Sequence, residues 1–128
     1  MKTLVDLDIK SALPQQAATS TVTGAAVDMQ AYGLNTHYVK GILFCLPTGA
    51  DAGETCDVKF QESPTTSSGD FVDIPGAAFP QVVQPGVTPV LLQIHFPIKK
   101  RYIRVIAALA GTTPAFTVGA AIALQKLQ

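Results

Sequence analysis

The stretch from residue 115 to residue 124, Ala-Phe-Thr-Val-Gly-Ala-Ala-Ile-Ala-Leu, decides the class of fold. Every second residue from Phe116 to Leu124 is apolar, and the residues between them are small and uncharged. Successive side chains of a β-strand point to opposite faces, so this period of two predicts a strand with one face turned to a core. The other face carries only Ala, Thr and Gly, which favours contact with a neighbouring subunit over contact with water.

Further strands follow on both sides of this one. Arg101–Leu109 alternates in the same way, and Ala110–Pro114 predicts the turn of a hairpin between the two. Six other segments read as strands or continuous apolar runs: Leu4–Ile9, Thr21–Tyr32, Tyr38–Leu46, Cys56–Glu62, Phe71–Ile74 and Pro89–Phe96. The 9 prolines and 10 glycines punctuate the chain roughly every ten residues, and no window has helical periodicity. The pattern predicts an all-β fold, a single-domain β-sandwich of about eight short strands over residues 1–128.

The composition points to association with other proteins. A chain of 128 residues fits one domain, and its charged residues make up only 14%, against an average of about 25%. The 9 basic and 9 acidic side chains cancel, which argues against a nucleic-acid partner. A weakly charged surface promotes association, so we expect other subunits to cover much of the exterior.

Two segments bear on localisation. Val105–Gln125 carries no charged residue, but the turn at Gly111–Pro114 divides it into two strands and argues against a membrane-spanning helix. Near the N-terminus, Asp6 and Asp8 stand where a secretory signal would have its apolar core. We therefore expect no membrane association, and synthesis in the cytoplasm of the producing cell.

The sequence offers little for catalysis. His37 and His95 are the only histidines, and no nucleophile elbow, P-loop or dinucleotide-binding motif is present. We therefore predict no catalytic, cofactor-binding or metal-binding residue and no enzymatic activity. A small β-barrel enzyme of the cupin kind stays open as an alternative, and a metal assay would detect it.

Cys45 and Cys56 flank the turn at Pro47–Gly53. A cross-strand disulfide or a metal site is one interpretation, but two sulfurs without clustered histidines do not complete a zinc site within this chain. The favoured interpretation is that both cysteines are free, buried thiols in a protein made in a reducing compartment.

Two charged clusters stand out. Asp51, Glu54 and Asp57 lack the spacing of a calcium-binding EF-hand loop, so a solvated acidic loop is favoured over a calcium site. The basic cluster consists of Lys99, Lys100, Arg101 and Arg104. It is small for a nucleic-acid patch. A subunit interface that meets the acidic loop of a neighbour and a plain solvated strand start both remain open.

Two segments carry a resemblance to a known family. One is residues 60–76, Phe-Gln-Glu-Ser-Pro-Thr-Thr-Ser-Ser-Gly-Asp-Phe-Val-Asp-Ile-Pro-Gly. The other is Lys-Arg-Tyr-Ile-Arg-Val at 100–105, followed by Ala-Gly-Thr-Thr-Pro-Ala-Phe-Thr-Val at 110–118. Together they resemble the jelly-roll capsid cement (decoration) proteins of short-tailed bacteriophages, over about residues 56–118.

The resemblance implies a jelly-roll-like sandwich that forms a homotrimer on the outside of the capsid and stabilises the shell. It implies the major capsid protein and the chain itself as partners, and it transfers no catalytic residue. An extended N-terminal arm over residues 1–13, the proline-rich segment 76–89 and the basic cluster are then the candidate surfaces. Their interface residues would be Leu4, Phe79, Val82, Lys99, Lys100, Arg101 and Arg104.

A phage fibre or tail module that binds a receptor or carbohydrate is the alternative. Such a module needs exposed aromatic side chains along a groove. The chain has no Trp, 3 Tyr and 6 Phe, and most of the Phe fall on core-facing positions of the predicted strands.

Overall fold

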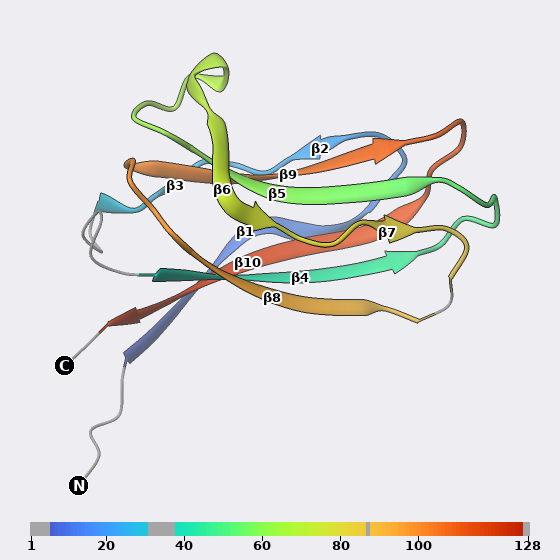
Figure 1. The fold of residues 1–128 in the computed structure, drawn as a ribbon, viewed down its shortest axis with the longest axis horizontal. Coiled ribbons are helices and arrows are strands. Elements are labelled where there is room, and N and C mark those ends of the chain that lie inside the picture. The colour runs from blue at the N-terminus through green and yellow to red at the C-terminus, as the bar shows by residue number, and fades with distance from the viewer. Residues whose placement is uncertain (1–5, 31–37, 87, 127–128) are drawn as a thin grey trace, which may run out of the picture.

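The computed structural model describes residues 6–30, 38–86 and 88–126. In these residues ten strands form two antiparallel sheets, and one short 3₁₀ turn covers Ser68–Asp70 (Figure 1). The strands are β1 (Asp6–Ala18), β2 (Val22–Thr23), β3 (Val27–Asp28), β4 (Tyr38–Pro47), β5 (Thr55–Ser63), β6 (Val72–Ala78), β7 (Val82–Val83), β8 (Val90–Pro97), β9 (Tyr102–Ala110) and β10 (Phe116–Lys126). The prediction of an all-β sandwich is confirmed.

Sheet A consists of long strands only, whereas sheet B also contains the two-residue strands β2, β3 and β7. Sheet A has four strands in the order β1-β10-β4-β8, and sheet B has the order β2-β9-β5-β6, with β3 also paired to β9 and β7 to β5. Figure 1 shows sheet B above sheet A, with most strands of both running along the length of the molecule and β6 descending across it. Apart from the consecutive strands β5 and β6, most paired strands come from distant parts of the sequence, as in the jelly-roll-like sandwich that was expected.

Each of the eight predicted strand segments overlaps a strand, and the structure differs in dividing one segment and in adding one strand. The segment 21–32 contains two short strands, because Gly24 lies against β1, where a Cβ would clash with the Ala12 carbonyl oxygen. The Gly24 amide still donates to the Val105 oxygen, so the chain stays attached to β9 between β2 and β3. The extra strand, β7, lies in the proline-rich segment.

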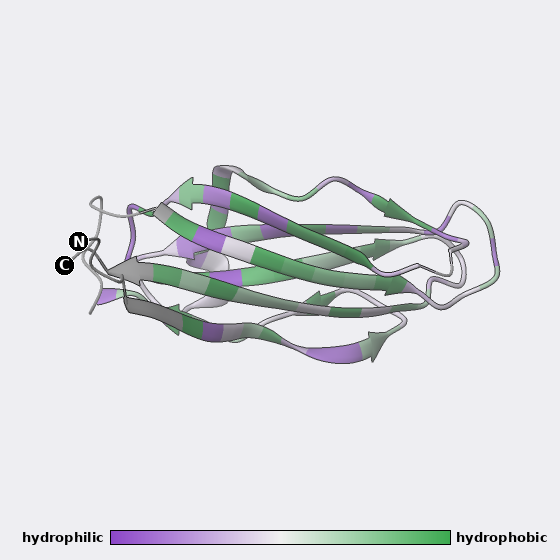
Figure 2. Cartoon of the chain, turned by 90° about the horizontal axis from the view of Figure 1, so that it is seen from below, coloured by the Kyte–Doolittle hydropathy of each residue, from purple (hydrophilic) through white to green (hydrophobic). Residues whose placement is uncertain are grey.

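The core lies between the sheets. On β10, Phe116, Val118, Ala120, Ile122 and Leu124 are all buried, which confirms the face predicted from their period of two. From the opposite sheet, β5 and β9 contribute residues that alternate in the same way, such as Phe60 and Val105. Figure 2 views the molecule from below, with sheet A in front, and its ribbons are mostly in hydrophobic colours with isolated purple bands.

Two buried polar side chains fix loops at opposite ends. Glu62 accepts hydrogen bonds from the main-chain amides of Lys99 and Lys100, at 2.9 and 3.2 Å, and so holds the β8–β9 connection. At the other end Gln84 donates to the Asp51 carbonyl and accepts from the Ala115 amide. Both side chains are at least 95% buried, so these bonds compensate their removal from water.

The N-terminal segment differs from the predicted arm. β1 begins at Asp6 and pairs with β10 from Asp6↔Lys126 to Ala18↔Phe116, so residues 6–13 belong to sheet A. Ala12 and Leu13 are buried. Met1–Val5, with Leu4, lies outside the described residues.

The proline-rich segment also differs from its prediction. Phe79 and Val82 were expected to be exposed, and this was wrong: they are 5% and 6% exposed. The ring centroid of Phe79 lies 6.0 Å from that of Phe60, and its amide donates to the Val58 oxygen. The prolines exclude a central strand, but they still allow β6 and β7 to run along the edge of sheet B and turn apolar residues into the core.

Candidate interaction surface

The outer face of sheet A, turned away from sheet B, is unusually poor in charge. Strand pairing sets its residues in rows across the sheet: Ile9, Ala123, Lys40 and His95; Ser11, Ala121, Ile42 and Gln93; Gly119, Phe44 and Leu91; Ala17, Thr117 and Leu46. Among the side chains that the structure describes on this face, Lys40 is the one formal charge. Leu91 and Ile9 are 69% and 60% exposed, which leaves large apolar side chains in water.

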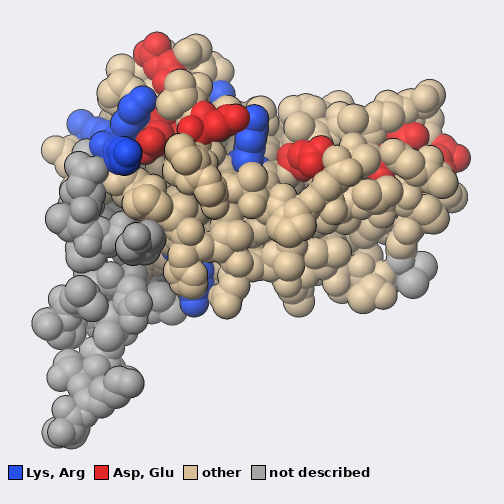
Figure 3. Space-filling model, viewed as in Figure 1, with Lys and Arg blue, Asp and Glu red and all other residues tan. Residues whose placement is uncertain are grey.

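The outer face of sheet B has the opposite character. It carries the ion pairs Lys59–Asp73 at 2.9 Å and Arg101–Asp28 at 2.8 Å. Figure 3 shows the charged side chains gathered over the upper half of the view, where sheet B lies, while the lower half over β4 and β8 is almost uncharged. The outer face of sheet B therefore suits contact with water, and the outer face of sheet A suits contact with another surface.

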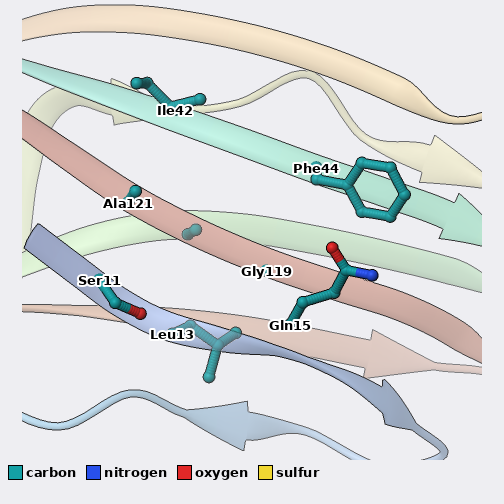
Figure 4. A pocket seen from close by; sticks show the side chains of 8 residues that line it. Ser11, Leu13, Gln15, Ile42, Phe44, Gly119 and Ala121 are labelled. Atoms are coloured by element: carbon teal, nitrogen blue, oxygen red, sulfur yellow. The ribbon is translucent and has the colours of Figure 1, made fainter. Parts of the chain in front are cut away.

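A hollow of about 240 Å³ interrupts the outer face of sheet A (Figure 4). Its lining residues are Ser11, Leu13, Gln15, Ile42, Phe44, Gly119, Ala120 and Ala121. The pairing of β1 with β10 shifts twice between Ser11 and Gln16, which brings Gln15 over Gly119. A Cβ at Gly119 would lie 2.9 Å from the Gln15 Cα, so the glycine is needed there. In Figure 4, Gln15 and Phe44 stand on either side of this glycine.

A second depression, of about 520 Å³, opens between β7 and β8. Its walls are apolar apart from Gln81 and Thr88, and comprise Pro47, Pro80, Gln81, Val82, Val83, Gly86, Thr88, Val90 and Leu92. Val90 and Leu92 point toward the core but stay half-exposed at this edge of the sandwich. The depression is a groove along the edge of sheet A and carries no charged group.

The predicted basic cluster is brought together at the β8–β9 connection, but its members differ in role. Arg101 donates two hydrogen bonds to Asp28, and its guanidinium lies over the ring of Tyr102. Arg104 lies 4.2 Å from the ring centroid of Phe71 and donates to Gln61 and Ser68. Both arginines therefore already hold elements of their own chain.

The acidic loop lies at the other end of the sandwich, beside the β9–β10 turn. Glu54 is 7% exposed and accepts a hydrogen bond from the Thr113 amide, and Asp51 bonds the Thr113 hydroxyl. The expectation of a fully solvated loop was therefore wrong for Glu54. In the described residues, no group of three or more His, Cys, Asp or Glu side chains is placed to hold a metal ion.

The two cysteines and the histidines show no catalytic arrangement in the described part of the chain. Cys45 and Cys56 are free and fully buried, as favoured from the sequence. His95 is exposed on the outer face of sheet A, and His37 lies outside the described residues. No helix in the described residues is long and apolar enough to span a membrane.

Comparison with known proteins supports the fold. No protein-family model matches the chain, and no curated protein does. Among solved structures, the SPBc2 prophage-derived protein YomS is similar over 98% of both chains, with a TM-score of 0.52 and 12% identity. An infectious bursal disease virus structure (Gx strain) has a TM-score of 0.51 and 9% identity, over 94% of this chain and 32% of the viral chain.

A third similar structure is the C-terminal family 22 carbohydrate-binding module of Clostridium thermocellum Xyn10B. It has a TM-score of 0.50 and 14% identity, over 91% of this chain and 84% of that one. Viral and carbohydrate-binding proteins thus share this β-sandwich. At such identities the likeness establishes the fold, and any choice between functions has to rest on the surface.

Proposed function

We propose that this chain is a bacteriophage virion structural protein, a capsid cement or decoration protein that binds the outer capsid surface as an oligomer and stabilises the shell. The observation that carries the proposal is the outer face of sheet A, which is broad, apolar and almost uncharged. Exposed apolar surface of this extent is typical of a protein interaction site. The partners proposed are the major capsid protein and further copies of this chain, as a homotrimer.

The similar prophage and virus structures are compatible with this role, and the resemblance in residues 56–118 points to the same class. The proposal includes synthesis in the host cytoplasm and a final position on the capsid exterior. It includes no enzymatic activity, no cofactor, and neither nucleic acid nor membrane as a partner.

The alternative, a fibre or tail module that binds a receptor or carbohydrate, is favoured by the likeness to the carbohydrate-binding module. Stacking of a sugar ring needs an exposed aromatic face. Phe60, Phe71, Phe79, Phe96 and Phe116 are buried. Of the aromatic side chains that the structure describes, Phe44 and Tyr102 are partly exposed, and they lie on different sheets. These described aromatic side chains form no common platform, so the cement role is preferred.

The test combines a native mass measurement with cosedimentation. Purified protein is mixed with capsids that lack it and is pelleted. The proposal expects saturable binding and capsids that resist heat better once decorated. Protein that stays in the supernatant at all concentrations, yet binds host-surface glycans, would support the alternative instead.

A further inference from the structure

Leu91, the most exposed large apolar side chain among the described residues, and the hollow on sheet A lie at the same level along the strands. Leu91 of β8 pairs with Phe44 of β4, and Phe44 pairs with Gly119 of β10. Gln15 of β1 lies beside Gly119. One row therefore carries a protruding leucine at one edge of the sheet and a hollow near the other edge.

This placement suits a particular symmetry. Rotation about an axis parallel to the strands does not change the position of a residue along that axis. The β8 side of one copy therefore meets the β1–β10 side of the next copy at the same level. Leu91 then faces the hollow beside Gln15. An axis in the plane of the face but across the strands would instead set Leu91 against Leu91 and hollow against hollow.

We propose that the outer faces of sheet A turn toward a threefold axis along the strands, with Leu91 of each copy inserted into the hollow over Gly119 of the next copy. The threefold number rests on the trimer of the proposed function, and the contact itself is the new element. Each copy provides one leucine and accepts one, which closes the ring after three contacts. The hollow, of about 240 Å³, is open to solvent, so a side chain that protrudes from a neighbouring copy can enter it.

The size of the face limits the strength of each contact. Four strands about 4.8 Å apart, each contributing about eight residues at roughly 3.3 Å, give a face of about 500 Å². Three such faces amount to about 1,500 Å², which the ring divides among three contacts, about 500 Å² for each pair of copies. A single contact of this size is below the standard range of about 1,200–2,000 Å² for a specific interface, so the trimer depends on all three contacts forming together. Two copies of this face would also not repel each other electrostatically, except at Lys40, which lies in the row at one end of the sheet. Its long side chain can carry the ammonium group out to water.

The first experiment is light scattering of the wild type, Leu91→Asp and the matched control Val72→Asp. Both substitutions put a carboxylate on an exposed β-strand residue, 69% exposed at Leu91 and 47% exposed at Val72 on β6. We expect three times the chain mass of 13.4 kDa for the wild type and for Val72→Asp, and the single-chain mass for Leu91→Asp. Circular dichroism and melting of the Leu91→Asp monomer check that it is folded.

The second experiment traps the contact by a disulfide between copies. In Gln15→Cys/Leu91→Cys the two new thiols would face each other across the contact, and mild oxidation should yield a covalent three-chain species on a non-reducing gel. In the control Ala17→Cys/Leu91→Cys, the first thiol is moved about 7 Å along β1, one row away. We expect at least tenfold less cross-linking there, because a disulfide needs the two Cβ atoms within about 4.5 Å.

The outcomes separate this contact from the proposed function. A trimeric wild type with an equally trimeric Leu91→Asp variant would overturn the contact and leave the cement role standing. A wild type that is monomeric at all concentrations would overturn it as well. If Leu91→Asp then loses capsid binding, the occupant of the face is the capsid protein. A trimer that depends on Leu91 but does not pellet with capsids would support the contact and refute the cement role.

Discussion

The rings of Phe60 and Phe96 meet between the two sheets, with their centroids 4.9 Å apart and their planes tilted by 33°. Phe60 comes from β5 and Phe96 from β8, so the pair joins sheet B to the edge strand of sheet A. Gly41 of β4 lies against both rings: a Cβ there would be 2.6 Å from Cε2 of Phe60 and 3.2 Å from Cε1 of Phe96. A glycine in the middle of a strand is explained by this close packing.

Gly41→Ala should therefore destabilise the fold by about 1–3 kcal/mol, because an added methyl group forces two packed rings to move. Chemical denaturation monitored by circular dichroism measures the effect. Gly69→Ala is the matched control, since a Cβ at Gly69 would meet nothing within 4 Å, and it should change stability by less than about 0.5 kcal/mol. Equal midpoints for the two variants would contradict the packing described.

The sequence predicted the regular strands and missed the features that depend on partners. The period of two set the inward face of Phe116–Leu124 correctly, because side-chain alternation is a local property of the backbone. Phe79 and Val82 were misplaced because their burial depends on β5, more than 15 residues earlier in the chain. The hollow over Gly119 follows from the irregular pairing of β1 with β10, and no local pattern around Gln15 indicates it.

The basic cluster illustrates the same limit. Four positive side chains in six residues predict a patch, and the structure does bring them together. Whether a given arginine is available depends on its contacts. Asp28 occupies Arg101 from 73 residues away, and Gln61 occupies Arg104 from 43 residues away. Charge spacing alone shows neither contact.

The two cysteines should remain thiols and should be dispensable for assembly. Acceptance of a hydrogen bond from Cys56 lowers the pKa of Cys45, while that bond and burial raise the pKa of Cys56. Both side chains are fully buried, which keeps reagents away from the sulfurs. We expect mass spectrometry of protein prepared without oxidant to show no disulfide, and iodoacetamide to modify both thiols only after unfolding.

Cys45→Ala/Cys56→Ala should keep the oligomeric state and capsid binding, with a loss of only about 1–2 kcal/mol of stability from packing. A disulfide in freshly purified protein, or a loss of assembly in the double variant, would assign the pair a role that we do not expect.

Asp28 should titrate well below an ordinary carboxyl group. Hydrogen bonds from the Arg101 guanidinium, followed by one from the Gln30 amide, lower its pKa from 3.8 to about 2. Because the folded value is the lower one, the contribution of this pair to stability is present above pH 3.8 and is lost as the pH falls toward 2. NMR titration of the Asp28 carboxyl measures the pKa directly.

Arg101→Gln should return the Asp28 pKa toward 3.8, and Asp28→Asn should make unfolding less dependent on pH in that window. The pair is exposed, so 1 M salt should reduce the shift. If the carboxyl titrates near 3.8 in the wild type, the hydrogen-bonded pair does not persist in solution.

The final prediction concerns how a cement protein with so few charges would hold a capsid. Surface ion pairs contribute only about 0–1 kcal/mol each, whereas buried apolar area contributes about 25 cal/mol per Å² before the costs of association. Several weak apolar contacts in one oligomer reinforce each other through effective concentration. Binding to expanded capsids should therefore change little between ~0.1 M and ~1 M NaCl, although the Debye length falls from ~10 to ~3 Å.

Two variants locate the attachment. Residues 6–13 belong to β1, so a deletion that tests the N-terminal segment and keeps all of β1 as described ends at Val5. The variant without residues 1–5 should stay an oligomer and pellet less with capsids. Lys99→Gln/Lys100→Gln should pellet almost as well as the wild type, since it removes charge from the basic cluster and leaves the bonds of Arg101 and Arg104 in place. If instead high salt and the double lysine variant both release the protein, while the shortened chain binds normally, attachment is electrostatic and the basic cluster provides it.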